Sequence, residues 1–272
     1  MVNSAVIYPY DDSNISLLLF DNSYNCKITH VVSPSAWGYC SKDAGENLGI
    51  VTSYTVINDL TTSFNKVNVL ILLEPQHKIN KFELFILALD YLKAGKDVIL
   101  LCELDTIYLD ILEQTATFFG SQFIIYSSLD SEPNISTNYT LINPPVPVIG
   151  IVGLASHTNK FDTLLPMNKN FKDKGYKTLC ITAKYNSNFL QVMPYPEYMF
   201  SSSMDIHSKI IAFNYYVNEL YHQIKPDVIL IEIPGGMFPI SNKLHEKFAF
   251  QNYLVSNAIS FDACVANLLY EN

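Results

Sequence analysis

Residues 147–161 read PVIGIVGLASHTNKF, and this stretch decides the fold of the second half of the chain. Its apolar part, residues 147–153, is typical of a strand that is buried on both faces. A polar turn of residues 154–159 follows, and a helix is predicted from Lys160 to Gly175. Strand, loop, lysine and helix form a cradle for phosphate, because backbone N–H groups and the helix N-terminus face the oxygens. The stretch therefore predicts a phosphate-binding loop with Lys160 as its cation.

Two residues of this loop depart from the usual pattern. Asn159 stands where such loops have glycine, and asparagine enters left-handed backbone geometry more readily than most residues. Phe161 follows the lysine, where a Ser or Thr normally gives its hydroxyl to Mg²⁺. A phenyl ring cannot ligate a metal, so Mg²⁺ is doubtful unless Thr158, Thr163 or Asp162 substitutes. We expect phosphate binding to survive and hydrolysis to be very slow.

A second informative segment is KPDVILIEIPGG, residues 225–236. It reads as a buried strand that delivers Glu232 and a glycine turn to its carboxyl end, the edge where ligands of open α/β sheets gather. Glu232 is the candidate metal ligand, and Gly235 and Gly236 would let the backbone approach a phosphate. The alternative is structural: Glu232 caps a neighbouring loop, and Lys160 begins a helix in a loop that no longer binds.

Three segments together resemble a degenerate form of dethiobiotin synthetase. The segments are residues 153–160, 175–184 and 230–236. In that family a glycine lies seven residues before the lysine, a second lysine follows the next strand, and a strand ends in Glu-Gly-x-Gly-Gly. The matching positions in this chain are Lys160, Lys184 and Glu232. Of these, Glu232 is the candidate metal ligand. The candidate ligand-binding residues are Gly153, Ser156, His157, Thr158, Asn159, Lys160, Lys184, Gly235 and Gly236.

The first half of the chain alternates apolar strands with amphipathic helices, which predicts a parallel sheet with crossover helices. The expected strands are 5–8, 28–32, 67–73, 97–102 and 123–126, and the expected helices are 80–94 and 106–119. The loop after the first strand reads PYDDSN, residues 9–14, and lacks the Gly-x-Gly-x-x-Gly of a dinucleotide site. This loop therefore gives no reason to expect NAD binding.

The fold class is α/β with two domains, each a mostly parallel sheet flanked by helices, the second of P-loop type. Residues 128–147 lose the periodicity and are rich in Ser, Asn, Thr and Pro, which predicts a linker. It would join a Rossmann-like domain, 1–127, to a degenerate P-loop domain, 148–272. Residues 261–270 read as the approach to, or the body of, a further core strand. A final helix is either missing or supplied by another subunit, so a homodimer is a candidate.

The composition of the chain limits the classes of partner that it is expected to bind. The 272 residues include 17 Lys and Arg against 26 Asp and Glu, a net charge of −9 that argues against nonspecific binding to nucleic acid or anionic membranes. No apolar run is long enough to span a membrane, and the start shows no signal-peptide pattern, so a cytoplasmic location is expected. No Cys-x-x-Cys pair occurs. The cysteines expected to be buried are Cys26, Cys40, Cys102, Cys180 and Cys264.

A wider resemblance covers nearly the whole chain. Residues 42–50, KDAGENLGI, lie in a Rossmann-like first domain joined to such a second domain. This is similar to a two-domain family that includes D-glutamate N-acyltransferases. The Asn- and Tyr-rich sequence also resembles the peptide maturation system proteins that clostridia carry beside radical-SAM enzymes and small cysteine-rich precursor peptides.

These resemblances imply a degenerate P-loop protein that binds ATP, GTP or CoA and acts in maturation of a ribosomally made peptide natural product. The implied partners are a small phosphate-bearing ligand, a precursor peptide and a radical-SAM enzyme. Two other functions stay open: an N-acyltransferase or ATP-dependent ligase acting on an amino acid or peptide, and a noncatalytic accessory protein that binds a peptide or an enzyme. No catalytic residue is assigned, because the members of a catalytic set meet in space and not in sequence.

Overall fold

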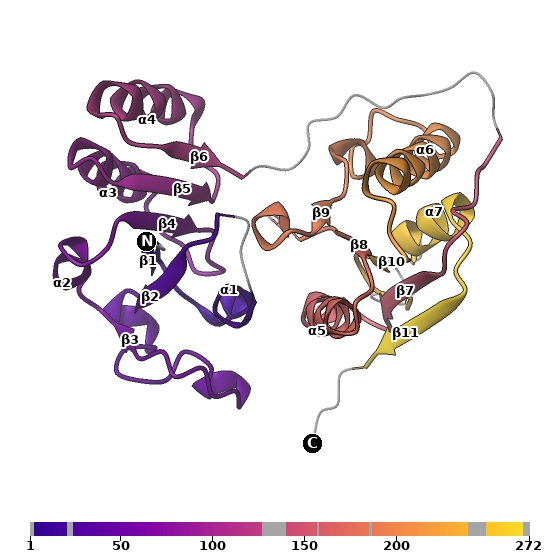
Figure 1. Ribbon diagram of the computed structural model, residues 1–272, viewed down its shortest axis with the longest axis horizontal. Coiled ribbons are helices and arrows are strands. Elements are labelled where there is room, and N and C mark those ends of the chain that lie inside the picture. The colour runs from indigo at the N-terminus through magenta and orange to yellow at the C-terminus, as the bar shows by residue number, and fades with distance from the viewer. Residues whose placement is uncertain are drawn as a thin grey trace. The chain divides into compact units, whose positions relative to one another are not determined.

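The computed structural model describes residues 3–20, 24–126, 140–156, 158–184, 187–238 and 249–268 of the chain. The chain divides into two compact units, Met1–Ser127 and Ser128–Asn272. Each unit is built on one parallel sheet with helices packed on it (Figure 1). The predicted α/β class with two sheet-based domains is confirmed.

The sheet of the first unit has the strand order β3-β2-β1-β4-β5-β6, the order of a Rossmann-type sheet. Its strands are β1 Ser4–Tyr8, β2 Lys27–Val32, β3 Val56–Ile57, β4 Val69–Leu73, β5 Asp97–Leu101 and β6 Phe123–Ile125. Every residue of the central strand β4 is buried, as its uninterrupted apolar run predicts. Ile7 of β1 pairs with Ile71 of β4 on one side and with Val31 of β2 on the other.

Helices of the first unit follow the strands in alternation. The described α-helices are α1 Ser16–Leu19, α2 Leu60–Phe64, α3 Lys81–Lys93 and α4 Thr106–Phe119. Asn80 begins α3, because its side chain accepts the backbone N–H of Phe82 at 3.0 Å. The predicted helices 80–94 and 106–119 agree with α3 and α4 within the residue or two by which helix ends vary.

The sheet of the second unit has the order β11-β7-β10-β8-β9, and all its paired strands are parallel. Its strands are β7 Val148–Gly153, β8 Thr178–Thr182, β9 Met193–Pro194, β10 Val228–Glu232 and β11 Ala263–Asn267. Strand β10 lies between β7 and β8 although it comes long after both in the chain. The carboxyl ends of these three strands therefore meet at one edge.

Helix α5, Lys160–Asp173, packs on β7, β8 and β10. Helices α6, Ile206–Ile224, and α7, Phe250–Ala258, pack against each other and lie on the opposite side of the sheet from α5 (Figure 1). Buried apolar side chains of the sheet, α6 and α7 form one core that includes Phe213 and Leu254.

The second unit contains elements that the sequence did not predict, among them α7 and β9. Helix α6 is not predicted, although Asp205 gives a start signal by accepting the backbone N–H of Ser208 at 3.0 Å. Of the predicted linker, residues 128–139 lie outside the described residues. Ile142 is docked on α6, because the buried Asn214 and Asn218 donate side-chain N–H groups to its carbonyl at 2.8 and 2.9 Å.

The predicted core strand within 261–270 is wrong about burial. Strand β11 lies at the edge of the sheet beside β7, and all five of its residues are exposed or half-buried. Cys264 is exposed for this reason and Cys40 is only half-buried, whereas Cys26, Cys102 and Cys180 are buried as expected. No helix within the described residues combines the length and apolar character that crossing a membrane requires.

Candidate functional site

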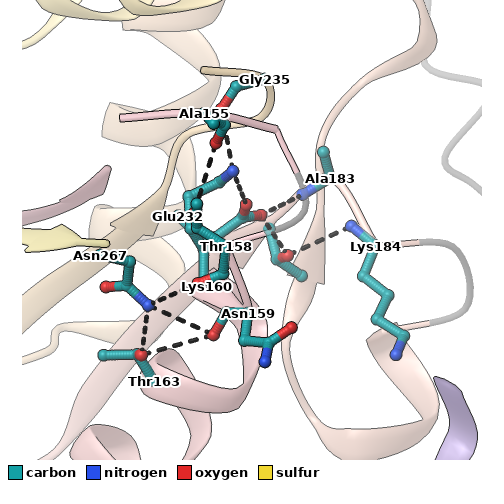
Figure 2. A network of polar contacts seen from close by, with 11 residues as sticks. Ala155, Thr158, Asn159, Lys160, Thr163, Ala183, Lys184, Glu232, Gly235 and Asn267 are labelled. Carbon is teal, nitrogen blue, oxygen red and sulfur yellow. Dashed lines mark hydrogen bonds and ion pairs between the residues drawn. The ribbon is translucent and has the colours of Figure 1, made fainter. Parts of the chain in front are cut away.

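The candidate site lies at the carboxyl edge of the second sheet, where β7 and β10 are neighbours. Register pairs Glu232, the last residue of β10, with Ile151 of β7. The loop after β7 ends at Lys160, the first residue of α5. The strand order thus brings Lys160 and Glu232 together, and Figure 2 shows their charged groups directed toward each other.

Lys160 is buried, with an exposed fraction of 7%. Its Nζ donates a hydrogen bond to the Gly235 carbonyl at 2.9 Å and lies 3.9 Å from Glu232 Oε1. Burial lowers the pKa of the Lys160 ammonium, and the Glu232 carboxylate opposes that shift. The lysine therefore ties the loop after β7 to the turn after β10.

Glu232 has partners for both carboxylate oxygens. Oε1 faces Lys160, while Oε2 accepts hydrogen bonds from the Thr182 hydroxyl at 2.7 Å and the Ala183 backbone N–H at 3.2 Å. The Thr182 hydroxyl also accepts the backbone N–H of Lys184 at 3.1 Å. Glu232 consequently joins the ends of β10 and β8 to the start of α5.

These contacts do not fit a Mg²⁺ site. Mg²⁺ needs several oxygen ligands in octahedral geometry, whereas one oxygen of Glu232 faces an ammonium and the other accepts two hydrogen bonds. Phe161 supplies no hydroxyl and is buried. Among the described residues, no group of three or more His, Cys, Asp or Glu side chains could hold a metal.

Two glycines allow close packing here: Gly153 lets the loop after β7 fold back on itself, and Gly236 lets that loop pack against the turn after β10. A Cβ on Gly153 would lie 2.0 Å from the Thr158 hydroxyl, and a Cβ on Gly236 would lie 2.7 Å from the Cα of Ala155. The Gly153 carbonyl in turn accepts the backbone N–H of Met237 at 2.9 Å. In this structure the backbone that approaches Gly236 is therefore the protein's own loop.

Asn159 begins α5 in left-handed geometry, with φ 53° and ψ 37°. The side chain that holds this turn is Asn267, at the end of β11, which sequence reasoning missed. Its Nδ2 donates to the carbonyl of Thr158 at 3.0 Å and to the Thr163 hydroxyl at 2.6 Å (Figure 2). The main-chain carbonyl of Asn267 accepts the backbone N–H of Leu154 at 3.1 Å. The only sequence signal is its place at the end of a strand.

Lys184 lies near the first turn of α5. It is half-buried, and Figure 2 shows its side chain extending away from the Glu232 carboxylate. Its Nζ lies 4.9 Å from the centre of the Phe161 ring, a cation–π distance. Ser156 is exposed at the loop tip. His157, the remaining predicted loop residue, lies outside the described residues.

Tyr195 is a second residue that the sequence did not indicate. It is 2% exposed, its hydroxyl has no hydrogen-bond partner among the described residues, and its backbone N–H donates to the Thr182 carbonyl at 2.9 Å. Burial, aided by the charge of Glu232, raises the pKa of Tyr195 well above its usual value. The phenol therefore stays protonated beside the Glu232 carboxylate.

The fold and site together define an α/β protein of two parallel-sheet units, the second with a strand, a loop and a helix whose first residue is a buried lysine. No family model matches the chain, and neither does any curated protein. A solved DUF1611 family protein from Anabaena variabilis is similar over 97% of this chain and 74% of that chain, with a TM-score of 0.64 and 14% sequence identity. At that identity the likeness concerns the fold alone.

Homoserine dehydrogenase from S. aureus is similar over 48% of this chain and 33% of that chain, with 17% identity and a TM-score of 0.33. A TM-score this low supports no conclusion. The resemblances to dethiobiotin synthetase and to the clostridial peptide maturation proteins are untested by these likenesses and stay predictions.

Proposed function

We propose that the second unit binds the diphosphate group of a nucleotide or of coenzyme A at the β7–α5 loop, without a divalent metal. The observation that carries the proposal is the buried Lys160 ammonium at the first residue of α5, directly after a central strand. Burying a cation costs free energy, and here its ion-pair contact is long, at 3.9 Å from Glu232. A bound anion would offset that cost.

The position of the lysine also favours phosphate. Unpaired backbone N–H groups at a helix N-terminus attract anions, and the helix dipole adds a positive field. The side chain of Asn159 makes no capping hydrogen bond to α5, so the first N–H groups of this helix are not taken by a side-chain cap. Release of Lys160 from the Gly235 carbonyl would turn its ammonium toward the ligand.

A metal-free site favours binding over phosphoryl transfer, because that chemistry relies on metal ions to bridge phosphates and neutralise charge. The role in peptide maturation, its precursor-peptide and radical-SAM partners, and the acyltransferase or ligase alternative stay predictions from the sequence. No contact among the described residues favours one of them.

The test is a thermal-shift panel of ATP, GTP, acetyl-CoA and coenzyme A, each with Mg²⁺ and with EDTA. A ligand at a hundred times its dissociation constant adds about 2.7 kcal/mol to stability, which raises the melting temperature measurably. The first two ligands report a nucleotide site and the last two a CoA site.

Lys160→Ala should abolish the shift. Lys174→Ala is the matched control, because Lys174 is an exposed lysine at the opposite end of α5. No shift with any of the four ligands, or a shift that Lys160→Ala leaves intact, would contradict the proposal.

A further inference from the structure

Phe161 occupies the position where a Ser or Thr hydroxyl would ligate Mg²⁺. In this chain its ring contacts the Lys184 ammonium instead. The residue after the lysine of a phosphate loop normally gives its hydroxyl to Mg²⁺. Here that residue is a buried ring, and the Lys184 ammonium lies 4.9 Å from the ring centre. The negative face of an aromatic ring attracts an ammonium group, so Phe161 holds Lys184 beside the first turn of α5.

The charges around this turn favour a bound anion. Lys160 and Lys184 both lie near the N-terminus of α5, where the helix dipole is also positive. Glu232 faces Lys160, and Asp162 interacts electrostatically with Lys184. Each of the two ammonium groups thus has a carboxylate near it. The helix dipole adds a positive field that neither carboxylate pairs with. A diphosphate group carries more than one negative charge and would complement both lysines.

We propose that the Lys184 ammonium, positioned by the Phe161 ring, replaces the divalent metal as the second positive charge beside a bound diphosphate. This inference rests on the proposed function, because it concerns the same ligand. Lys160 reaches the ligand from the loop, and Lys184 reaches it from the end of β8. The replacement explains why Phe161 and a fully partnered Glu232 occur together: neither is needed for a metal.

The experiment measures the affinity of the full chain for inorganic pyrophosphate by calorimetry, in EDTA and in Mg²⁺. Pyrophosphate is the probe because nucleotides and coenzyme A share its chemistry. The wild type should bind it at least as tightly in EDTA as in Mg²⁺, because Mg²⁺ competes for the pyrophosphate in solution. Lys184→Gln should weaken binding in EDTA by about tenfold or more, because it removes a charge-assisted contact. Lys174→Gln, which removes the same charge from an exposed position, should bind like the wild type.

The positioning role of Phe161 needs a readout that folding alone would not move. Phe161→Leu should weaken pyrophosphate binding, whereas Phe161→Tyr keeps an aromatic face and should retain it. In a Lys184→Gln background the Leu and Tyr variants should bind equally, because no ammonium remains to be held. A Leu effect that persists in that background would show that Phe161 acts through packing and would overturn its positioning role.

The two hypotheses fail in different ways. Absence of pyrophosphate binding by the wild type, or binding that Lys160→Ala leaves unchanged, would remove the proposed function and this inference with it. Binding that depends on Lys160 but is equal in Lys184→Gln and Lys174→Gln would overturn only the inference. A wild-type affinity that falls tenfold or more in EDTA would overturn the inference and also the metal-free part of the proposed function, because it would show that a metal is still used.

Discussion

In each unit a buried charged side chain links the loops that follow two neighbouring strands. The side chain is an aspartate in the first unit and a lysine in the second. In the first unit, Asp11 in the loop after β1 is 1% exposed and accepts the backbone N–H of Gln76, in the loop after the neighbouring β4, at 2.6 Å. In the second unit, Lys160 after β7 donates to the carbonyl of Gly235, in the turn after the neighbouring β10, at 2.9 Å. Both hydrogen bonds join the loops that follow two adjacent central strands.

The difference in sign has consequences for binding. Asp11 also accepts the backbone N–H of Ser13 at 3.1 Å, so the first unit uses N–H groups of its loop on an anion of its own. Lys160 instead brings a cation that a phosphate would complement. The parallel sheet determines where the loops meet, and one charged side chain determines which ligands the edge favours.

The largest effect expected from this comparison is on stability. Asp11→Ala should lower the free energy of unfolding of the first unit by about 3 kcal/mol or more, because several donors lose a charged acceptor. Lys160→Met should cost about 1 kcal/mol or less, since Glu232 keeps its hydrogen bonds from Thr182 and Ala183. Urea denaturation measures both, with fluorescence of the single tryptophan, Trp37, reporting the first unit and far-UV circular dichroism the whole chain. Equal losses would mean that the two links are equivalent.

A smaller effect concerns the turn that receives the lysine. Gly236→Ala should destabilise the second unit by about 2 kcal/mol, because the new Cβ meets the backbone of Ala155 and the loop must move. Gly235→Ala should cost about 1 kcal/mol, since Gly235 has φ +77° but open space around it. Thermal denaturation of the two variants gives the order. A Gly235→Ala variant less stable than Gly236→Ala would show that backbone geometry, and not loop packing, is limiting.

The sequence predicted the parts of this edge better than their connections. The strand ending at Gly153 and the helix beginning at Lys160 follow from an apolar run and a polar turn, both of which are local signals. Asn159 has the left-handed geometry that its replacement of glycine suggested. The hydrogen bond from Lys160 to Gly235 joins residues that are 75 positions apart, and it exists because β10 lies between β7 and β8. No local pattern encodes that order.

The missed contributors have the same explanation. Asn267 and Tyr195 reach the site only because β11 and β9 lie where the sheet order places them, and their own segments carry no motif. In the first unit, residues 9–14 visibly lack the glycine fingerprint, so this loop gave no reason to expect NAD binding. That Asp11 crosses to Gln76 could not be predicted, because it depends on β4 being the neighbour of β1.

The smallest expected effect is the pH dependence that Lys160 confers. Its pKa is lowered below 10.5 mainly by burial, so between the lowered pKa and 10.5 the unfolded chain binds a proton that the folded chain has released. The free energy of unfolding of the wild type, relative to Lys160→Met, should therefore rise with pH across this window.

Pyrophosphate should change this behaviour, because a bound anion favours the protonated lysine. Its stabilising effect on the wild type should fall as the pH rises and Lys160 loses its proton, whereas Lys160→Met should gain little from pyrophosphate at any pH. Urea denaturation between pH 7 and 10, with and without pyrophosphate, measures all four curves, and the difference between the two proteins removes contributions from tyrosines and other lysines. If both proteins show the same pH dependence in both conditions, the Lys160 charge is not the one that binds the anion.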